Sequence, residues 1–172
     1  MPRTASASLW RPTARSYRWS DGYPVLYASL DLDVAFAERL KRTGFQRTPL
    51  LVGIARASIA RTLDLTSDQT LATFGLSVTA VTGPDYAPSQ RLGRELFETG
   101  VAALLVPAAI AEVPTQLPRF VLVRERERQE RTTPGVGVNL VIFTGNLRPG
   151  DGYREIERFL CAIFGLSPGD ER

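Results

Sequence analysis

The stretch YRWSDGYPVLYAS, residues 17–29, is the part of the sequence around which the rest of the fold can be predicted. Residues 25–29 form an apolar and aromatic run that predicts a β-strand. Ser29 or Asp31 can cap the helix that follows, and Gly44 after basic residues is expected to end it. The expected apolar stripe of that helix is Leu32, Ala35, Phe36 and Leu40. Glu38 lies beside this stripe, so the region joins an arginine, several aromatic rings and a carboxylate in a plausible site.

The rest of the chain alternates strand and helix signals, which predicts an α/β or α+β fold with a mixed sheet. Strands are expected at residues 8–11, 49–60, 102–106 and 138–143, and 63–66 is expected to be a connecting segment. Helices are expected at 68–74 and 88–98, with glycines after each. A final helix is expected from the spacing of Ile156, Phe159, Leu160, Ile163 and Phe164.

Residues 119–131 begin as an apolar strand and continue with charge on both faces, RERERQER. A strand of that composition cannot be central in a sheet, so residues 119–136 are expected to form a charged arm or loop. This segment can be a solvated arm or a docking surface for a partner. Residues 1–7 are expected to be a mobile end, and the 172 residues are expected to form a single domain.

The charge of +3 comes from arginine, because Lys41 is the only lysine among 21 basic residues. Arginine's planar fork suits phosphate and carboxylate, which favours an anionic ligand, although a composition bias explains the count equally well. No lysine-rich tail or long basic run marks a nucleic-acid footprint, so direct nucleic-acid binding is not favoured. A structural or nucleic-acid-binding module that uses the arginines stays as an alternative.

The sequence contains no histidine and a single cysteine, Cys161. An intramolecular disulfide is therefore excluded, as are a cysteine cluster for zinc and any mechanism that needs imidazole. The apolar run at 100–111 is too short to span a bilayer, so a transmembrane segment is not expected. The first 18 residues are basic and faintly resemble a transit peptide but lack the apolar region of a secretory signal. A reducing, cytoplasmic location is expected, and the oligomeric state is open.

Each candidate site residue has an ordinary structural explanation when taken alone. Glu38 can pair with Arg42 four residues later on a helix, Tyr27 can belong to the core or to a sheet edge, and Arg11 and Arg18 can be solvated. Taken together, the four residues fit one specific type of reaction. Two arginines can hold a diphosphate, a tyrosine can stack on a ring, and one carboxylate can stabilise a sugar oxocarbenium ion. These requirements match the nicotinamide–ribose bond of NAD, whose leaving group needs no general acid.

A set of ordered motifs covers most of the chain from Leu9 to Phe143. They are LWR at 9–11, YRWS at 17–20 followed by Gly22, PVLYA at 24–28, Glu38, LDLT at 63–66, SQRL at 89–92, GV at 100–101, LLVP at 104–107 and VNLVIF at 138–143. In this order they resemble the RES domain, a bacterial toxin family named for an arginine, a glutamate and a serine. Each motif is weak alone, and their shared order carries the resemblance.

The resemblance implies an α+β fold with mixed twisted sheets and flanking helices, similar to ADP-ribosyltransferases. It also implies a toxin that consumes NAD as its substrate by phosphorolysis, hydrolysis or ADP-ribosyl transfer, without a metal, and a small helical antitoxin as partner. On that reading Glu38 stabilises the ribosyl cation, Tyr27 packs on the nicotinamide side, and Arg11 and Arg18 hold the phosphates. Tyr17 and Trp19, which flank Arg18, and Ala108, at the position of the family serine, belong to the same expected cofactor-binding set.

The sequence departs from the family pattern at three places. Ala108 stands where the family serine follows the Leu-Val-Pro strand end, so the hydroxyl is missing. The segment between Arg11 and Arg18 is short, with Tyr17 and Ser20 in place of the family's glycine and asparagine. The charged segment after Ala109 is long. A catalytically degenerate RES domain that binds a nucleotide or a protein is therefore the alternative function.

Overall fold

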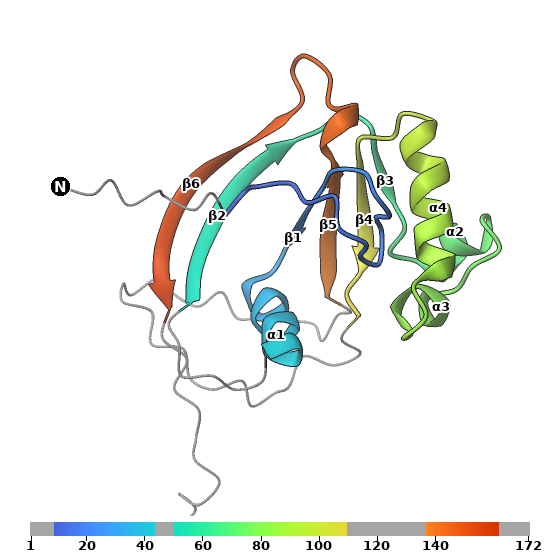
Figure 1. The fold of residues 1–172 in the computed structure, drawn as a ribbon, viewed down its shortest axis with the longest axis horizontal. Coiled ribbons are helices and arrows are strands. Elements are labelled where there is room, and N and C mark those ends of the chain that lie inside the picture. Colours follow the sequence, from blue (N-terminus) through green and yellow to red (C-terminus); the bar gives the residue numbers. More distant parts are fainter. Residues whose placement is uncertain (1–8, 44–49, 110–136, 162–172) are drawn as a thin grey trace, which may run out of the picture.

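The computed structural model describes residues 9–43, 50–109 and 137–161 of the chain, and it is an α+β fold with two separate sheets (Figure 1). The central sheet has the strand order β1-β5-β4-β3, and a second sheet consists of β2 and β6. The strands are β1 (Val25–Ser29), β2 (Leu50–Ser58), β3 (Thr62–Asp64), β4 (Ala103–Pro107), β5 (Val138–Phe143) and β6 (Gly152–Cys161). The helices are α1 (Leu32–Thr43), α2 (Asp68–Ala72), α3 (Val78–Thr82), α4 (Ala87–Glu98) and the 3-10 turn η1 (Thr144–Asn146).

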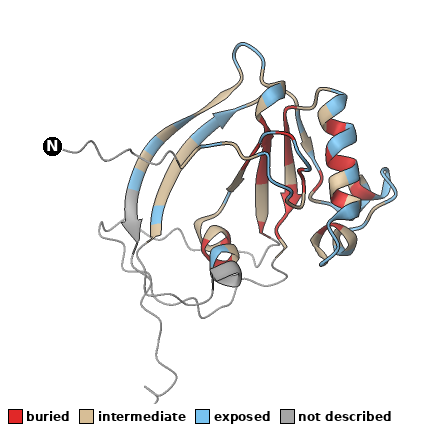
Figure 2. Ribbon diagram, viewed as in Figure 1, coloured by how far each residue is buried: buried red, intermediate tan, exposed pale blue. Residues whose placement is uncertain are grey.

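The central sheet is mixed because β3 runs parallel to β4, while β5 pairs antiparallel with both β1 and β4. The expected strands at 25–29, 102–106 and 138–143 are therefore confirmed. Side chains from alternate positions enter two cores on opposite faces of this sheet. The larger core packs against α2, α3 and α4 through Leu71, Val81, Leu92 and Leu96. Figure 2 shows the buried residues concentrated in this sheet and on the sheet-facing side of α4.

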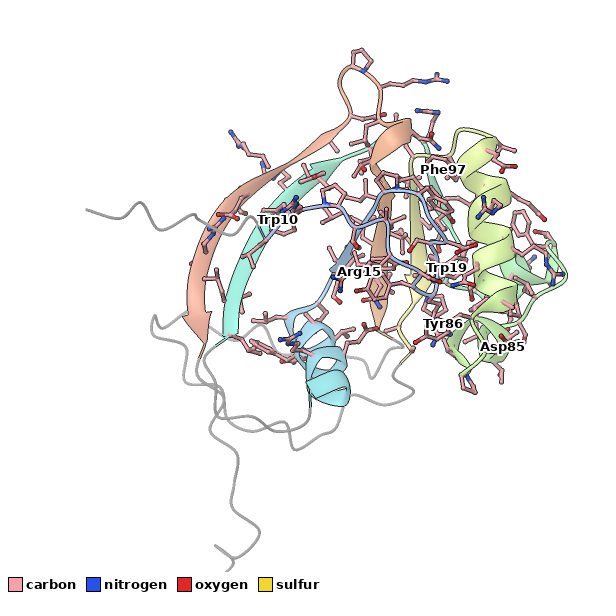
Figure 3. The ribbon with its side chains drawn as sticks, viewed as in Figure 1. Trp10, Arg15, Trp19, Asp85, Tyr86 and Phe97 are labelled. Carbon is pink, nitrogen blue, oxygen red and sulfur yellow. The ribbon has the colours of Figure 1, made fainter. Side chains whose placement is uncertain are left out.

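The opposite face of the central sheet carries a smaller core of Leu26, Ala103, Leu140 and Ile142. Trp10 and Tyr153 pack against it, so the N-terminal segment and the start of β6 cover this face. Trp10 also donates its indole N–H to Glu155 Oε2 at 2.5 Å. Figure 3 shows Trp10 beside the β2–β6 ribbon.

Two helices begin and end where the sequence predicts. Ser67 caps α2 by accepting a hydrogen bond from Thr70 N at 3.1 Å. Gly75 and Gly100 follow α2 and α4 with φ of +69° and +87°, a conformation that glycine adopts without steric cost. Asp31 rather than Ser29 caps α1, because its Oδ1 accepts from Asp33 N at 2.8 Å and from Val34 N at 3.3 Å.

The expected C-terminal helix is wrong, because residues 152–161 form strand β6. β6 pairs antiparallel with β2 along its whole length, with a register shift at Ile54/Ala55. Ile156, expected in a buried helical face, is 53% exposed. Spacing of apolar residues cannot reveal a partner strand about a hundred residues away, and the pairing with β2 outweighs the local helical pattern.

Other expectations about the elements need smaller corrections. Residues 9–11 form no strand, and the N-terminal segment instead makes an isolated bridge between Thr13 and Val25. Part of the expected connecting segment at 63–66 belongs to β3, and α3 was not expected. The buried residues of α1 are Val34, Phe36 and Ala37, whereas Leu32 and Ala35 are only half-buried. The segment 1–7, Gly44 and the charged arm at 119–136 lie outside the described residues.

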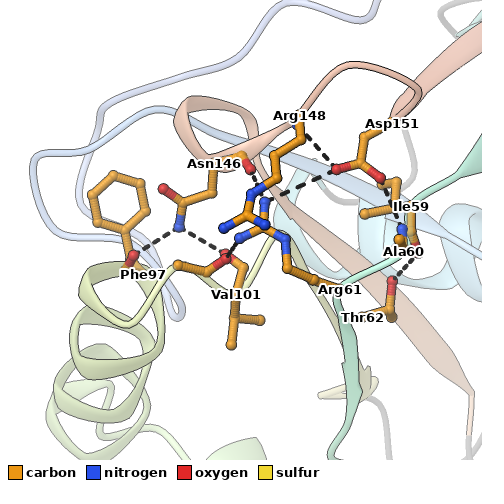
Figure 4. Close-up of polar contacts among 10 residues, drawn as sticks. Ile59, Ala60, Arg61, Thr62, Phe97, Val101, Asn146, Arg148 and Asp151 are labelled. Atoms are coloured by element: carbon orange, nitrogen blue, oxygen red, sulfur yellow. Dashed lines mark hydrogen bonds and ion pairs between the residues drawn. The ribbon is translucent and has the colours of Figure 1, made fainter.

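Arg61, just before β3, connects the end of α4 to the loop after β5 (Figure 4). Its guanidinium donates to the carbonyl of Gly100 and to that of Asn146. The side-chain amide of Asn146 donates to the carbonyls of Phe97 and Val101, each at 2.7 Å. These bonds fasten the β5–β6 connection to the end of α4.

Asp151 anchors the turn that leads into β6. Its carboxylate accepts from Ala60 N at 2.8 Å and from Arg148 N at 3.0 Å, and it lies 4.0 Å from the Arg61 guanidinium. The two backbone hydrogen bonds, more than Arg61, hold the pKa of Asp151 below its ordinary value. Among the described residues, no helix is long and apolar enough to cross a membrane.

Candidate functional site

The candidate site lies at the end of the central sheet where β1 and β4 finish and β5 begins. There Ser29 of β1 is directly opposite Asn139 of β5, and Val106 of β4 flanks Asn139 on the other side. Asn139 alternates with Val141 and Phe143, so it faces the larger core. Tyr27 and Ser29 face the same side, as they alternate with Val25.

Helix α1 crosses this end of the sheet and packs tightly on it through Val34. A methyl group added to Gly137 would lie 2.4 Å from Val34 Cγ2 and 3.3 Å from Ala108 Cβ. Glu38 follows Val34 by four residues, so both lie on the sheet-facing side of the helix. The position of Val34 therefore directs Glu38 toward the end of β5.

Glu38 is half-buried and is held by a chain of side-chain hydrogen bonds. Asn139 Nδ2 donates to Glu38 Oε1 at 2.5 Å, and Ser29 Oγ donates to Asn139 Oδ1 at 2.6 Å. Glu38 Oε2 makes no hydrogen bond to the described residues. The sequence alternative, an ion pair with Arg42, involves a side chain outside the described set.

Tyr27 is fixed by its hydroxyl and lies beside Tyr17. The hydroxyl accepts from Trp19 N at 3.0 Å and donates to Ser20 Oγ at 3.2 Å. The rings of Tyr17 and Tyr27 meet edge to face with centroids 5.9 Å apart. Tyr27 is half-buried, and its ring borders the same sheet face as Glu38 and Asn139.

The loop before β1 is held against α4 at Gly93. A Cβ at Gly93 would lie 2.9 Å from Trp19 O and 3.0 Å from the Tyr23 hydroxyl, so only glycine permits this approach. Tyr23 donates to Trp19 O at 2.8 Å and stacks on Phe97 at 4.5 Å. Burial raises the pKa of Tyr23, with a smaller contribution from nearby Tyr27, so its hydroxyl remains a donor at neutral pH.

Arg18 is fastened to the end of α3. Its Nη1 donates to Val81 O at 2.8 Å and to Gly83 O at 2.7 Å, and its Cζ lies 4.4 Å from the Tyr86 ring centroid. Figure 3 shows Tyr86 beside α3 and α4. An anion at this position would have to use the remaining N–H groups of the guanidinium.

The other expected site residues lie in different environments. Trp19 is 2% exposed and belongs to the larger core, and Ala108 is equally buried beneath α1. Arg11 is exposed and follows Trp10, which packs on the opposite face of the sheet. The structure thus brings Glu38 and Ala108 to the end of the central sheet, with Tyr27 and Tyr17 bordering the same face. Among the described residues no group of His, Cys, Asp and Glu side chains could hold a metal ion.

Sequence reasoning missed Ser29 and Asn139 as members of the site. From the sequence, Ser29 is expected only as a helix cap, and residues 138–143 are expected to be an apolar strand and one of the family motifs, with no separate role for Asn139. The available signal was Asn139 itself, a lone amide inside that strand, since asparagine is depleted in strands.

The fold of the chain is similar to that of a solved structure. It is similar to one chain in the crystal structure of the M. tuberculosis MbcT–MbcA toxin–antitoxin complex, with a TM-score of 0.60 and 18% identity over 84% of this chain and 70% of that chain. At this identity the likeness concerns the fold. The model of the RES domain family matches residues 2–148, and the chain therefore belongs to that family. No curated protein matches the chain.

Proposed function

We propose that this protein is a RES-type toxin that cleaves the nicotinamide–ribose bond of NAD, with water, phosphate or a protein as acceptor. Membership of the RES family supports the class, and the solved structure with a similar fold comes from a toxin–antitoxin complex. The observation that carries the proposal is the half-buried Glu38 carboxylate, which has one oxygen bound to a neutral amide and the other without a hydrogen bond to the described residues.

The chemistry follows from the charge that develops as the bond breaks. Nicotinamide leaves as a neutral molecule, so no proton has to be supplied, and positive charge grows on the ribose. A carboxylate about 4 Å away stabilises such a charge by about 4 kcal/mol at an effective dielectric constant of 20. Tyr27 and Tyr17 would flank the nicotinamide, and Arg18 would contact the diphosphate through the remaining N–H groups of its guanidinium. Arg11, expected in the same role, follows Trp10 on the other face of the central sheet, so no contact with the diphosphate is proposed for it.

The test is the release of nicotinamide from NAD, measured with and without phosphate. Glu38→Gln keeps the shape and removes the charge, so we expect kcat to fall about 10²–10³-fold, the usual scale for one stabilising group. Glu98→Gln, at an exposed position of α4, is the matched control and should retain the wild-type rate. An unchanged rate in Glu38→Gln would remove Glu38 from the mechanism.

A second candidate is a degenerate RES domain that binds NAD without cleaving it. The observation that favours it is Ala108, which is buried against the region of Gly137 and Val34 and offers no hydroxyl. This candidate predicts measurable NAD binding, no nicotinamide release by the wild type, and release by Ala108→Ser. Release by the wild type would rule it out.

We also propose that a small helical antitoxin is the partner. The support is the similar fold found in a toxin–antitoxin complex. Co-expression with the product of a neighbouring small reading frame should give a stable complex that releases no nicotinamide. Separate elution of the two proteins would argue against this partner.

A further inference from the structure

We infer that Asn139 is the positioning residue for Glu38, and that Ser29 holds the Asn139 amide in place. This inference rests on the proposed function and adds two residues to its site. Ser29 and Asn139 are directly opposite each other on β1 and β5, and 101 residues separate Asn139 from Glu38. The network therefore joins three elements at one point: β1, β5 and α1.

The hydrogen-bonding chemistry sets the direction of the amide. A carboxylate can only accept, so the NH₂ end of Asn139 must face Glu38. The carbonyl end then faces Ser29, whose hydroxyl is able to donate. The opposite orientation would place two acceptor oxygens against each other at 2.5 Å. The carboxylate of Glu38 thus selects the orientation of the amide, and Ser29 holds the other end of it by donating to Asn139 Oδ1 at 2.6 Å.

A neutral donor has a specific advantage at this place. An arginine or lysine would hold the carboxylate equally well, but its charge would cancel the field at the ribose. The amide fixes Glu38 Oε1 without cancelling its charge and leaves Oε2 unengaged by the described residues. The carboxylate is therefore held in place before substrate arrives, which favours the transition state over the bound substrate.

The kinetic test compares variants that change the hydrogen-bonding groups of Asn139 and Ser29. Asn139→Ala removes the donor, and Asn139→Asp keeps the shape but replaces the donor with an acceptor. For both we expect kcat to fall about 10–100-fold with KM within about threefold of wild type, since a misplacement of 1 Å costs about 10²-fold. Ser29→Ala should lower kcat less, and Ser29→Thr, which keeps the hydroxyl, should restore it.

Asn146→Ala is the matched control for structural damage. Asn146 also donates from its amide to two acceptors, but these are backbone carbonyls at the end of α4. This variant should lose thermal stability and keep the wild-type kcat in its folded fraction. Wild-type kcat in both Asn139 variants, or an equal loss of kcat in Asn146→Ala, would overturn the inference.

A second measurement does not depend on activity. In ¹⁵N NMR spectra, the side-chain amide protons of Asn139 should shift upfield in Glu38→Ala, because their carboxylate acceptor is gone. Unmoved signals would overturn the inference. If the wild type releases no nicotinamide, the proposed function fails, and the amide signals still decide whether Asn139 holds Glu38.

Discussion

Replacing Gly137 by alanine should push α1 away from the central sheet. Gly137 is buried directly before β5, and an added Cβ would lie 2.4 Å from Val34 Cγ2 and 2.9 Å from Cγ1. Carbon atoms prefer about 3.5–4.0 Å, so the shorter contact falls about 1.1 Å short of the lower limit. Val34 is fully buried and β-branched, and such a side chain has essentially one rotamer in a helix. The helix must therefore move.

The expected loss of stability is about 1–3 kcal/mol, the usual cost of an overpacked core. Gly137 is not among the glycines with positive φ, so the cost is steric rather than conformational. Thermal unfolding should record it as a lower Tm, by about 2–4 °C for each kcal/mol at this chain length. A displacement of about 1 Å would also lengthen the bond from Asn139 to Glu38 to about 3.5 Å, where a hydrogen bond is lost. Nicotinamide release should then fall more than stability alone explains.

A double-mutant cycle with Val34→Ala tests whether the clash with the Val34 methyl groups causes the loss of stability. Val34→Ala removes both methyl groups that clash, so Gly137→Ala should cost less than about 1 kcal/mol in that background, with a coupling energy of about 1–2 kcal/mol. The two single variants and the double variant are compared by urea unfolding. An equal cost of Gly137→Ala in both backgrounds would refute the assigned clash.

Three further predictions concern side chains whose hydrogen bonds stabilise the fold. Asn146→Ala leaves the Val101 carbonyl without this donor, while the Phe97 carbonyl still accepts from Gly100 N at 3.1 Å, so urea unfolding should show a loss of about 1–3 kcal/mol; a loss below about 0.5 kcal/mol would contradict this. The pKa of Asp151 is lower in the folded state, so its contribution to the free energy of unfolding is present at neutral pH and disappears as the pH falls below about 4. Asp151→Asn should therefore be less stable than wild type at pH 7 and should lose less stability than wild type on acidification. Parallel curves of stability against pH for the two proteins would contradict this. Ser67→Ala should cost about 1 kcal/mol and speed hydrogen exchange at the Thr70 amide, whereas unchanged exchange would show that the cap is dispensable.

Elements with strong local signals could be predicted from the sequence. β1, β4 and β5 are short apolar runs bounded by turns, and α4 has a regular apolar face with a glycine stop. β6 was predicted as a helix because Ile156, Phe159 and Leu160 fit a helical spacing, whereas the strand depends on pairing with β2. β3 has only three residues, and its pairing with β4 is equally non-local.

Contacts between residues far apart in the sequence also limited the prediction of the site. Glu38 and Tyr27 could be selected because they occur in ordered motifs close together in the sequence. Asn139 also occurs in one of these motifs, but its role as the partner of Glu38 arises only when β5 lies beside β1 and beneath α1. Arg18 could be selected because it precedes β1 in the same motif as Tyr17 and Trp19, but its bonds to Val81 and Gly83 depend on how α3 packs against the loop before β1.

The separation of 101 residues between Glu38 and Asn139 has a consequence during protein synthesis. The acid leaves the ribosome early, but its amide partner belongs to the last strand of the central sheet to be made. A nascent chain therefore contains Glu38 without the hydrogen bond from Asn139 until β5 has emerged and has inserted between β1 and β4. In such a chain the site cannot exist until β5 has been made and has left the ribosome, which leaves the translating cell time to supply any inhibitor made alongside it.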